Sequence, residues 1–389
     1  MIDCGRPAGI ASRRTSRGAH RDWEMHISSL DTPALLVDLD KTEANLDRAA
    51  GYARRHGLLL RPHTKTHKSP LIARMQLDRG AAGLTVAKVG EAEVMAREGV
   101  PNLLLAYPVW GDAKWRRLVE VAKRLPVTVA LDSAEVAGGL SRHAQQAGIT
   151  LGILVEADLG MRRCGLPPGE GLVRLAQEVS GMGGLRLDGL MFYPGHINLA
   201  AEAGGQQIET LRGELRAVLE SFRKNGLPTE VVSGGSTPTL FQSHTVEGMT
   251  EIRPGTYVFN DRTQVAAGAC TWQDCAVTVL VTVVSTPRPD TAVIDGGSKT
   301  FTSDPLRPGG DGGFGRVVEM PSARFHKMSE EHGQLDLREH AGPGPRIGQR
   351  LRIIPNHVCV TVNMHETAYG LRGETVQQSW PVAGRGKLQ

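Results

Sequence analysis

The stretch RPHTKTHK places a lysine where it could act as a nucleophile. Lys65 follows the apolar run that begins at Leu58, with Arg61, His63 and His67 close by. If the run is a buried strand, the amine lies at its end, where desolvation and neighbouring positive charge both favour the neutral form. A neutral amine is what Schiff-base formation requires. Most lysines near strand ends are solvated surface residues, so a catalytic interpretation needs further groups at the same point.

Further reactive or hydrogen-bonding groups follow the later apolar runs. They are Arg163 after the fifth run, Tyr193 and His196 after the sixth, Ser236 and Thr237 after the seventh, and Arg253, Gly255 and Thr256 in the eighth. Free backbone N–H groups in Gly/Ser/Thr turns can bind a phosphate. Such a turn is usually only a turn, but strands seven and eight are where barrel phosphate sites are frequent. A lysine, a phosphate site and arginines together indicate pyridoxal 5'-phosphate (PLP).

The elements that would position these groups alternate between strand-like and helix-like patterns. Short apolar runs occur at 58–65, 83–89, 102–108, 127–133, 150–158, 187–195, 230–234 and 251–259. Stretches with helical period lie between them, at 91–98, 113–124, 133–147 and 206–225. Eight such units predict an α/β fold, a closed (β/α)₈ TIM barrel. No G-x-G-x-x-G follows the first run, which disfavours a dinucleotide-binding sheet.

Beyond residue 262 the pattern becomes β-rich, with Gly/Pro loops between the runs, and predicts a C-terminal all-β domain. The run 32–40 precedes the barrel, and we expect it to pair with this domain. The predicted division is therefore a tail at 1–27, the first strand of the β domain at 28–40, the barrel at 41–262 and the β domain at 263–389. The Arg-rich tail is interpreted as a disordered segment. Alternatively, the start of the chain is mis-assigned and Met25 is the natural first residue.

His357 and Cys359 in PNHVC are candidate metal ligands. On a strand, residues two apart project from one face and could bind one ion. An isolated His-x-Cys is weak evidence, because both residue types are commonly buried for packing. An imidazole with a thiolate favours zinc over harder ions.

Composition narrows the classes of function. The 45 Lys and Arg against 41 Asp and Glu give a net charge of +4, which predicts no nucleic-acid partner. No apolar stretch approaches the roughly 18 residues of a membrane span. Five cysteines at irregular spacing do not resemble a disulfide framework and indicate a reducing, cytoplasmic location.

The ordered motifs resemble those of one enzyme family. They are DTPALLVDLD, RPHTKTHKSP, TVAKVGEAEVM, GMRRCG, GSTPT, EIRPGTYVFND, EEHG and IPNHVCVTVN. Together they are similar to the D-threonine aldolase / D-serine dehydratase family, which are fold-type III PLP enzymes with an alanine racemase-like barrel. The resemblance implies a PLP- and divalent-metal-dependent lyase for D-3-hydroxy amino acids, active as a homodimer with shared sites.

The resemblance also implies residue roles. Lys65 would bond to PLP, Arg163 would face the cofactor and the substrate carboxylate, Arg253 would face the pyridine nitrogen, and Tyr193 would pack against the ring. Ser236, Thr237, Gly255 and Thr256 would bind the phosphate, His196 would act as a base, and His357 and Cys359 would hold Zn²⁺ or Mn²⁺. The His-x-Cys pair matches zinc-dependent D-serine dehydratases, whereas manganese-activated D-threonine aldolases typically carry His-x-Asp.

Several reactions remain open at this point. We favour D-threonine aldolase, which releases glycine and an aldehyde, because the motif wording resembles that branch over the whole chain. The alternative is a D-serine or D-threo-3-hydroxyaspartate dehydratase, which gives a 2-oxo acid and ammonia. A racemase is the less favoured alternative. A further alternative is a non-catalytic PLP carrier. It is disfavoured because such carriers generally lack the β domain and the metal pair.

Overall fold

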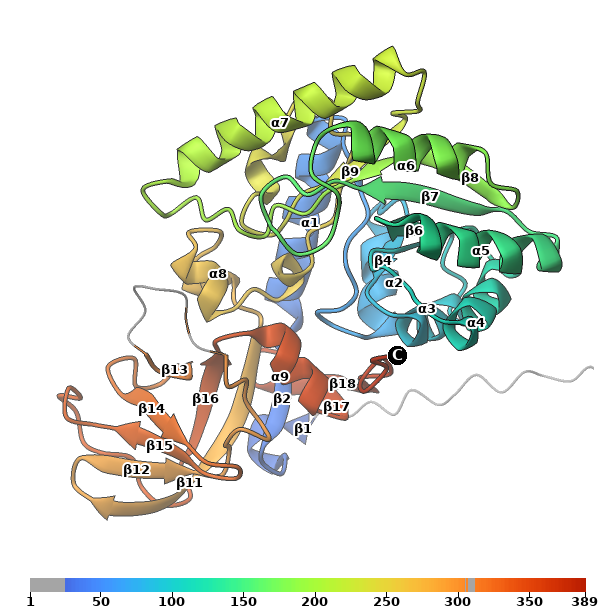
Figure 1. Ribbon diagram of the computed structural model, residues 1–389. Coiled ribbons are helices and arrows are strands. Elements are labelled where there is room, and N and C mark those ends of the chain that lie inside the picture. Colours follow the sequence, from blue (N-terminus) through green and yellow to red (C-terminus); the bar gives the residue numbers. More distant parts are fainter. Residues whose placement is uncertain (1–24, 305, 307–311) are drawn as a thin grey trace, which may run out of the picture.

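The computed structural model describes residues 25–304, 306 and 312–389. Within them, parallel strands alternate with helices in the first part, and antiparallel strands dominate the last part (Figure 1). The predicted tail lies outside the described residues up to residue 24. Its last three residues are ordered, since β1 (Met25–His26) pairs with a C-terminal strand and a 3₁₀ turn begins at Ile27. Residues 25–27 of the predicted tail therefore contact the β domain through backbone hydrogen bonds.

The described residues of the first part form an eight-stranded parallel sheet in the order β3-β10-β9-β8-β7-β6-β5-β4. A parallel bridge between His63 and Thr85 joins the two end strands, so the ring continues past β3 and β4. Successive residues of each strand face opposite sides: Leu104, Ala130, Leu154 and Met191 form a cluster apart from the larger core beneath the helices. The strand bounds are β3 (Leu59–Leu60), β4 (Leu84–Val86), β5 (Leu103–Leu105), β6 (Val127–Leu131), β7 (Leu151–Glu156), β8 (Leu185–Met191), β9 (Val231–Gly234) and β10 (Glu251–Ile252).

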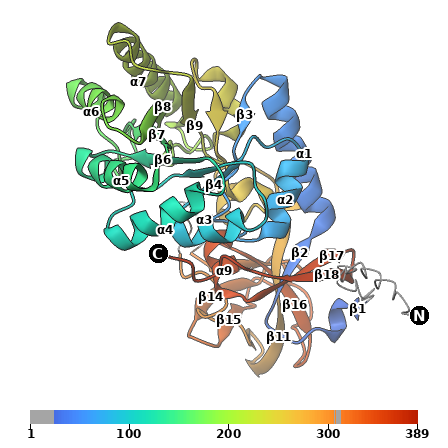
Figure 2. The same cartoon turned by 90° about the vertical axis from the view of Figure 1, so that its right-hand side faces the viewer.

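Helices cover the outside of this sheet (Figure 2). Local signals fix their ends: Asp38 and Ser133 accept hydrogen bonds from backbone N–H groups as N-caps, and Gly148 ends its helix in the left-handed region at φ 64°. The helices are α1 (Leu39–Arg55), α2 (Pro70–Asp78), α3 (Val89–Ala96), α4 (Asp112–Ala122), α5 (Ala134–Ala147), α6 (Glu170–Ser180) and α7 (Gly204–Lys224), followed by α8 (Arg262–Ala266). Strand–helix alternation thus gives the predicted (β/α)₈ barrel.

The β domain is built from both ends of the described chain. Its sheet runs in the order β1-β18-β17-β2-β11-β12-β15-β14-β13-β16, and a further β11–β16 pairing closes its last six strands into a ring. Strand β2 (Ala34–Asp38) lies between β17 and β11, parallel to the first and antiparallel to the second. The other strands are β11 (Val277–Arg288), β12 (Thr291–Ile294), β13 (Gly315–Val317), β14 (Arg324–Met328), β15 (Gly333–Asp336), β16 (Arg350–Pro355), β17 (Thr367–Arg372) and β18 (Thr375–Pro381).

One helix interrupts the β domain. The segment VCVTVNM, which the sequence predicted as a strand, forms α9 (Val358–Met364). The Val358 N–H donates to the buried Asp261 carboxylate over 3.0 Å, and the Thr361 hydroxyl donates to the His357 carbonyl. These bonds supply partners that a helix start requires. The strand prediction for His357 and Cys359 is therefore wrong: His357 caps the helix and Cys359 lies in its first turn.

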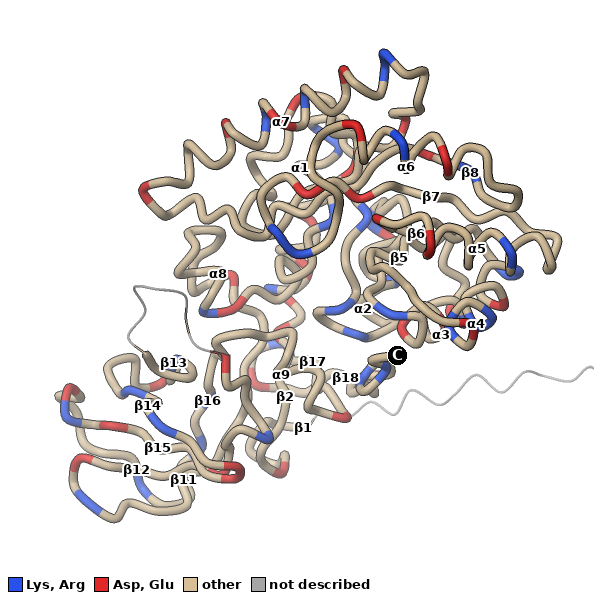
Figure 3. Tube along the Cα trace, viewed as in Figure 1, with Lys and Arg blue, Asp and Glu red and all other residues tan. Residues whose placement is uncertain are grey.

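Charges of both signs are interspersed along the barrel and the β domain (Figure 3). None of the helices formed by the described residues combines the length and the apolar character needed to cross a bilayer.

A buried ion pair anchors the loop that carries Lys65. Lys68 bonds to Glu91 at the start of α3, and the two side chains are 6% and 1% exposed. The second Glu91 oxygen accepts from the Ala87 N–H over 2.7 Å. The backbone carbonyl of Lys68 accepts from the Gly384 N–H over 2.8 Å, so the segment after β18 is tied to the same loop.

We expect Lys68→Met to lower the free energy of unfolding by about 3–5 kcal/mol, because it leaves the buried Glu91 carboxylate unpaired. Urea denaturation measures this loss. The double variant Lys68→Met/Glu91→Leu should recover most of it, since no buried charge remains. The exposed pair Lys123–Glu120 provides a control, and Lys123→Met should cost less than about 1 kcal/mol. Equal losses for Lys68→Met and Lys123→Met would contradict the prediction.

Candidate active site

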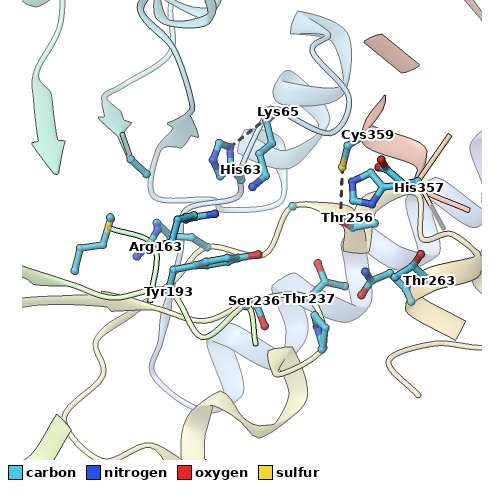
Figure 4. A pocket seen from close by; sticks show the side chains of 18 residues that line it. His63, Lys65, Arg163, Tyr193, Ser236, Thr237, Thr256, Thr263, His357 and Cys359 are labelled. Atoms are coloured by element: carbon cyan, nitrogen blue, oxygen red, sulfur yellow. Dashed lines mark hydrogen bonds between the residues drawn. The ribbon is translucent and has the colours of Figure 1, made fainter. Parts of the chain in front are cut away.

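One cavity lies at the carboxyl ends of the barrel strands, and residues of both domains line it (Figure 4). The predicted residues that line it are Lys65, Arg163, Tyr193, Ser236, Thr237, Arg253, Gly255, Thr256, His357 and Cys359. The structure therefore brings the lysine and the His-x-Cys pair to one cavity. The Thr66 hydroxyl, one residue after Lys65, hydrogen bonds to Cys359 Sγ over 3.1 Å.

Lys65 lies in the turn that follows β3. Its Nζ is 5.6 Å from the centroid of the Tyr193 ring, and the guanidinium carbon of Arg163 is 4.9 Å from the same centroid. Both distances permit cation–π attraction. The ring of Tyr193 therefore lies within reach of both Lys65 and Arg163.

His63 also lines the cavity, and its neutral state follows from its surroundings. Burial, followed by the charges of Lys65 and Arg253, holds the pKa of His63 well below 6.5. The backbone N–H of Lys65 donates to His63 Nδ1 over 3.3 Å, so the proton of the neutral imidazole is on Nε2. The sequence indicated His63 only as a charged neighbour of the lysine, but the structure shows a hydrogen-bond donor at the cavity.

Two turns, after β9 and β10, face each other across the cavity floor. The Thr237 hydroxyl accepts from the Tyr257 N–H over 3.1 Å and joins them. For the backbone N–H groups of Thr237 and Thr256, no acceptor is found among the described residues. A Cβ on Gly255 would lie 3.0 Å from Thr66 Oγ1 and 3.2 Å from the Cβ of His63, so glycine lets this turn pack closely against the Lys65 loop. These are the features of a phosphate-binding site.

Arg253 is the most buried cation of the cavity wall, at 5% exposed. Burial lowers the pKa of Arg253 to about 10, although the carboxylates of Glu251 and Glu156 oppose the shift. Burial also raises the pKa of Glu156 to about 7, with Arg253 acting against it and Asp132 adding to it. Arg253 thus stays protonated at neutral pH inside the barrel.

His357 and Cys359 lie beside each other at the opposite end from Arg163 (Figure 4). Burial alone would lower the pKa of His357, but Cys359 and Asp261 raise it to about 9. Burial alone would raise the pKa of Cys359, but His357 and Thr66 lower it. The pair favours a thiolate beside an imidazolium. No group of three or more His, Cys, Asp or Glu side chains arranged to bind a metal occurs among residues 25–304, 306 and 312–389.

The predicted base, His196, is absent from the described residues that line the cavity. His196 lies in the loop after β8, and its imidazole packs against Gly160. A Cβ added to Gly160 would lie only 2.9 Å from His196 Nε2. Burial lowers the pKa of His196, while Asp158 and Glu214 oppose the shift. Its Nδ1 is buried, with no partner among the described atoms. The adjacent Gly195 does line the cavity.

The sequence analysis missed three polar lining residues among others: Thr263, Gln264 and Asp304. Gln264 lies in α8, whose N-cap Asp261 accepts from the Gln264 N–H over 2.9 Å. Asp304 is held by its backbone, since its carbonyl accepts from Asn356 Nδ2 over 3.1 Å. Thr263 and Gln264 reach the cavity from the short helix α8 and Asp304 from a loop, and none of them lies directly at a strand end.

A parallel (β/α)₈ barrel with a lysine after its first strand, joined to an antiparallel β domain, defines the alanine racemase-like class of PLP-binding folds. Residues 37–263 match the family described as "Alanine racemase, N-terminal domain", and residues 276–371 match "Putative serine dehydratase domain". The first match covers more than half of the chain.

Individual relatives extend this result. A D-threonine aldolase of Arthrobacter sp. is 31% identical, covering 92% of this chain and 94% of its own. The crystal structure of D-threonine aldolase from Filomicrobium marinum superposes with a TM-score of 0.88 and 33% identity over 95% of this chain and 100% of its own. D-threo-3-hydroxyaspartate dehydratase of Delftia sp. (strain HT23) is 30% identical, covering 90% of this chain and 97% of its own. The structure of a cysteine-to-alanine variant of D-threo-3-hydroxyaspartate dehydratase, in the metal-free form, superposes with a TM-score of 0.84 and 29% identity. The match covers 92% of this chain and 99% of that chain.

The chain therefore belongs to the D-threonine aldolase / D-serine dehydratase family of fold-type III PLP enzymes.

Proposed function

We propose that the protein is a PLP- and divalent-metal-dependent lyase that cleaves D-3-hydroxy amino acids, with D-threonine aldolase as the specific activity. The observation that carries the proposal is the single cavity that Lys65 shares with His357 and Cys359. The relatives named as aldolases cover nearly the whole chain, β domain included.

The residues present fit PLP. The open N–H groups of Thr237 and Thr256 would hold the phosphate, with Gly255 in the second turn and Ser236 in the first. Lys65 would supply the amine, Tyr193 would cover the ring, and Arg253 would face its nitrogen. When bound, PLP withdraws electrons from the substrate α-carbon.

The donor set of His357 and Cys359 fits a divalent ion with open coordination positions, as catalytic rather than structural sites require. An imidazole with a thiolate favours zinc, and Mn²⁺ is the harder alternative. When bound, such an ion lowers the pKa of a coordinated hydroxyl group. The placement of the pair beside Lys65, where a substrate β-hydroxyl would lie, supports a catalytic rather than a structural ion.

The chain's own residues divide the remaining tasks. Arg163 would bind the substrate carboxylate, which fixes the amino acid in the cavity. His196 would take the proton of the β-hydroxyl, so that this oxygen forms the aldehyde carbonyl as the Cα–Cβ bond breaks. The electron pair of that bond stays with Cα, which gains a proton to become glycine. This role requires the His196 ring to turn from Gly160 toward the cavity.

The second candidate is a dehydratase, which removes the α-proton and the β-hydroxyl and yields a 2-oxo acid and ammonia. Cys359 favours it, because the resemblance links His-x-Cys to zinc-dependent dehydratases. The metal-free cysteine variant of a related dehydratase also connects a cysteine with the metal in that protein.

Incubation with D-threonine separates the two candidates. We expect glycine and acetaldehyde in equal amounts, measured by amino-acid analysis and an alcohol dehydrogenase-coupled assay. A matched incubation with L-threonine should give no product. Formation of 2-oxobutanoate and ammonia without glycine would replace the aldolase by the dehydratase.

We expect His196→Ala to lower kcat by about 10²- to 10⁴-fold, the usual contribution of a general base. Because the pKa of His196 is lowered, the neutral base persists on acidification, and the wild-type kcat should begin to fall only below pH 6.5. Stopped-flow kinetics across pH 5–9 measure both effects. PLP binding should be unchanged in the variant. A kcat within twofold of wild type would leave His196 outside the mechanism.

We further propose a homodimer with shared active sites, as the family resemblance implies, in a reducing cytoplasmic compartment. The cysteines among the described residues are free, in keeping with a thiolate ligand. Light scattering of the purified protein tests the dimer.

A further inference from the structure

A chain of buried polar side chains extends behind Arg253, away from the cavity. Arg253 Nη1 donates to Ser233 Oγ over 2.6 Å, and Nη2 donates to the Phe192 carbonyl over 2.9 Å. The Ser233 hydroxyl donates to Glu251 Oε1 over 2.5 Å, and Arg61 Nε donates to Glu251 Oε2 over 2.6 Å. Ser233 and Glu251 are 0% and 1% exposed. The sequence Arg61–Glu251–Ser233–Arg253 is called the Arg253 relay below.

The direction of each bond in the relay is fixed. A serine hydroxyl has one proton, and Ser233 donates it to Glu251, so only its lone pairs face Arg253. Backbone pairing makes the relay rigid, because Ser233 and Glu251 are directly opposed partners of β9 and β10. Any tilt of the Arg253 guanidinium would break a buried bond at Ser233 or Phe192.

We infer that Ser233 and Glu251 are positioning residues that hold the Arg253 guanidinium against the ring of bound PLP. The inference rests on the proposed function, which assigns Arg253 to the ring nitrogen. Ser233 and Phe192 occupy two of the guanidinium's five N–H groups, and Arg253 also lines the cavity.

The charges around Arg253 support this role. Glu251, Glu156, Tyr193 and Arg61 are the titratable groups that act on it. Glu251 pairs directly with Arg61 and reaches Arg253 through the Ser233 hydroxyl, with no direct hydrogen bond to the guanidinium among the described contacts. The guanidinium charge thus stays available to the cavity, and preorganised charge of this kind acts strongly in a buried site.

Ser233→Ala tests the inference, because it removes one oxygen and leaves both strands intact. We expect kcat for D-threonine to fall on the order of 10- to 100-fold while KM stays within about twofold, as for a misplaced catalytic group. The dissociation constant of PLP, measured by equilibrium dialysis, should rise roughly tenfold. The visible absorbance maximum of the bound PLP should move, because the charge at the ring changes.

Ser243→Ala is the matched control. Ser243 is equally buried, at 1% exposed, and its hydroxyl donates to the Thr239 carbonyl over 3.0 Å. This variant should lose similar stability by thermal unfolding but keep the wild-type absorbance maximum. If Ser233→Ala does not fold, Glu251→Gln tests the same relay, since the amide preserves volume and removes the charge.

Wild-type absorbance and kcat in a folded Ser233→Ala or Glu251→Gln protein would overturn the inference. Failure of the proposed function has a different signature, in which the wild-type protein itself binds no PLP or releases neither product from D-threonine.

Discussion

Lys65→Ala should abolish lyase activity, with kcat reduced on the order of 10⁴-fold or more, because the cavity then lacks the amine proposed to bond to the cofactor. Treatment of the wild-type protein with borohydride and PLP should leave a pyridoxyl group on Lys65, located by peptide mass spectrometry. The variant should show no such adduct and no visible absorbance of covalently bound PLP. Added methylamine should restore part of the activity, since it replaces the missing amine.

The matched control for this experiment is Lys224→Ala, which removes an exposed lysine in the last turn of α7. It should keep wild-type activity and the Lys65 adduct. An adduct on another lysine, or activity within tenfold of wild type in Lys65→Ala, would remove the amine from its proposed role.

His357→Ala should lower kcat by about 10²-fold or more, because it removes one of the two protein ligands of the proposed metal. Prolonged dialysis of the wild-type protein against chelator should cause a similar loss, and added Zn²⁺ or Mn²⁺ should reverse it. Metal content by plasma mass spectrometry should fall in step with activity. His326→Ala, an exposed histidine of β14, should change neither quantity. Full activity in a metal-free protein would contradict the prediction.

Cys359→Asp should change which metal supports activity. Replacing the thiolate with a carboxylate makes the donor set harder, so activation by Mn²⁺ should rise relative to Zn²⁺. The ratio of kcat with the two metals measures the change. Cys270→Asp provides a control at a cysteine outside the cavity lining.

The barrel could be predicted from the sequence because each strand is an apolar run and each run is followed by a helical period. The ends of the strands were less predictable. β3 and β10 end at Leu60 and Ile252, well before the apolar pattern stops. Pro62 and Pro254 follow these strands and carry no N–H for a ladder bond.

The segment that carries His357 and Cys359 shows where sequence patterns fail. VCVTVN is rich in β-branched residues, which favour strands, yet it forms α9. The deciding contact is the Asp261 carboxylate, which accepts from the Val358 N–H although it lies far away in the chain. Tertiary contacts of this kind override local propensity. The strand-end residues were accessible to prediction because they directly follow apolar runs, whereas Asp304 lies in a loop and Thr263 in the short helix α8.

The central place of β2 in the β domain has a consequence for biosynthesis. β2 leaves the ribosome before the barrel, but its neighbours β11 and β17 are translated only after it. At roughly 5–20 residues per second, this strand waits on the order of tens of seconds with both edges open. During that interval it is a target for chaperones or for premature association with other nascent chains.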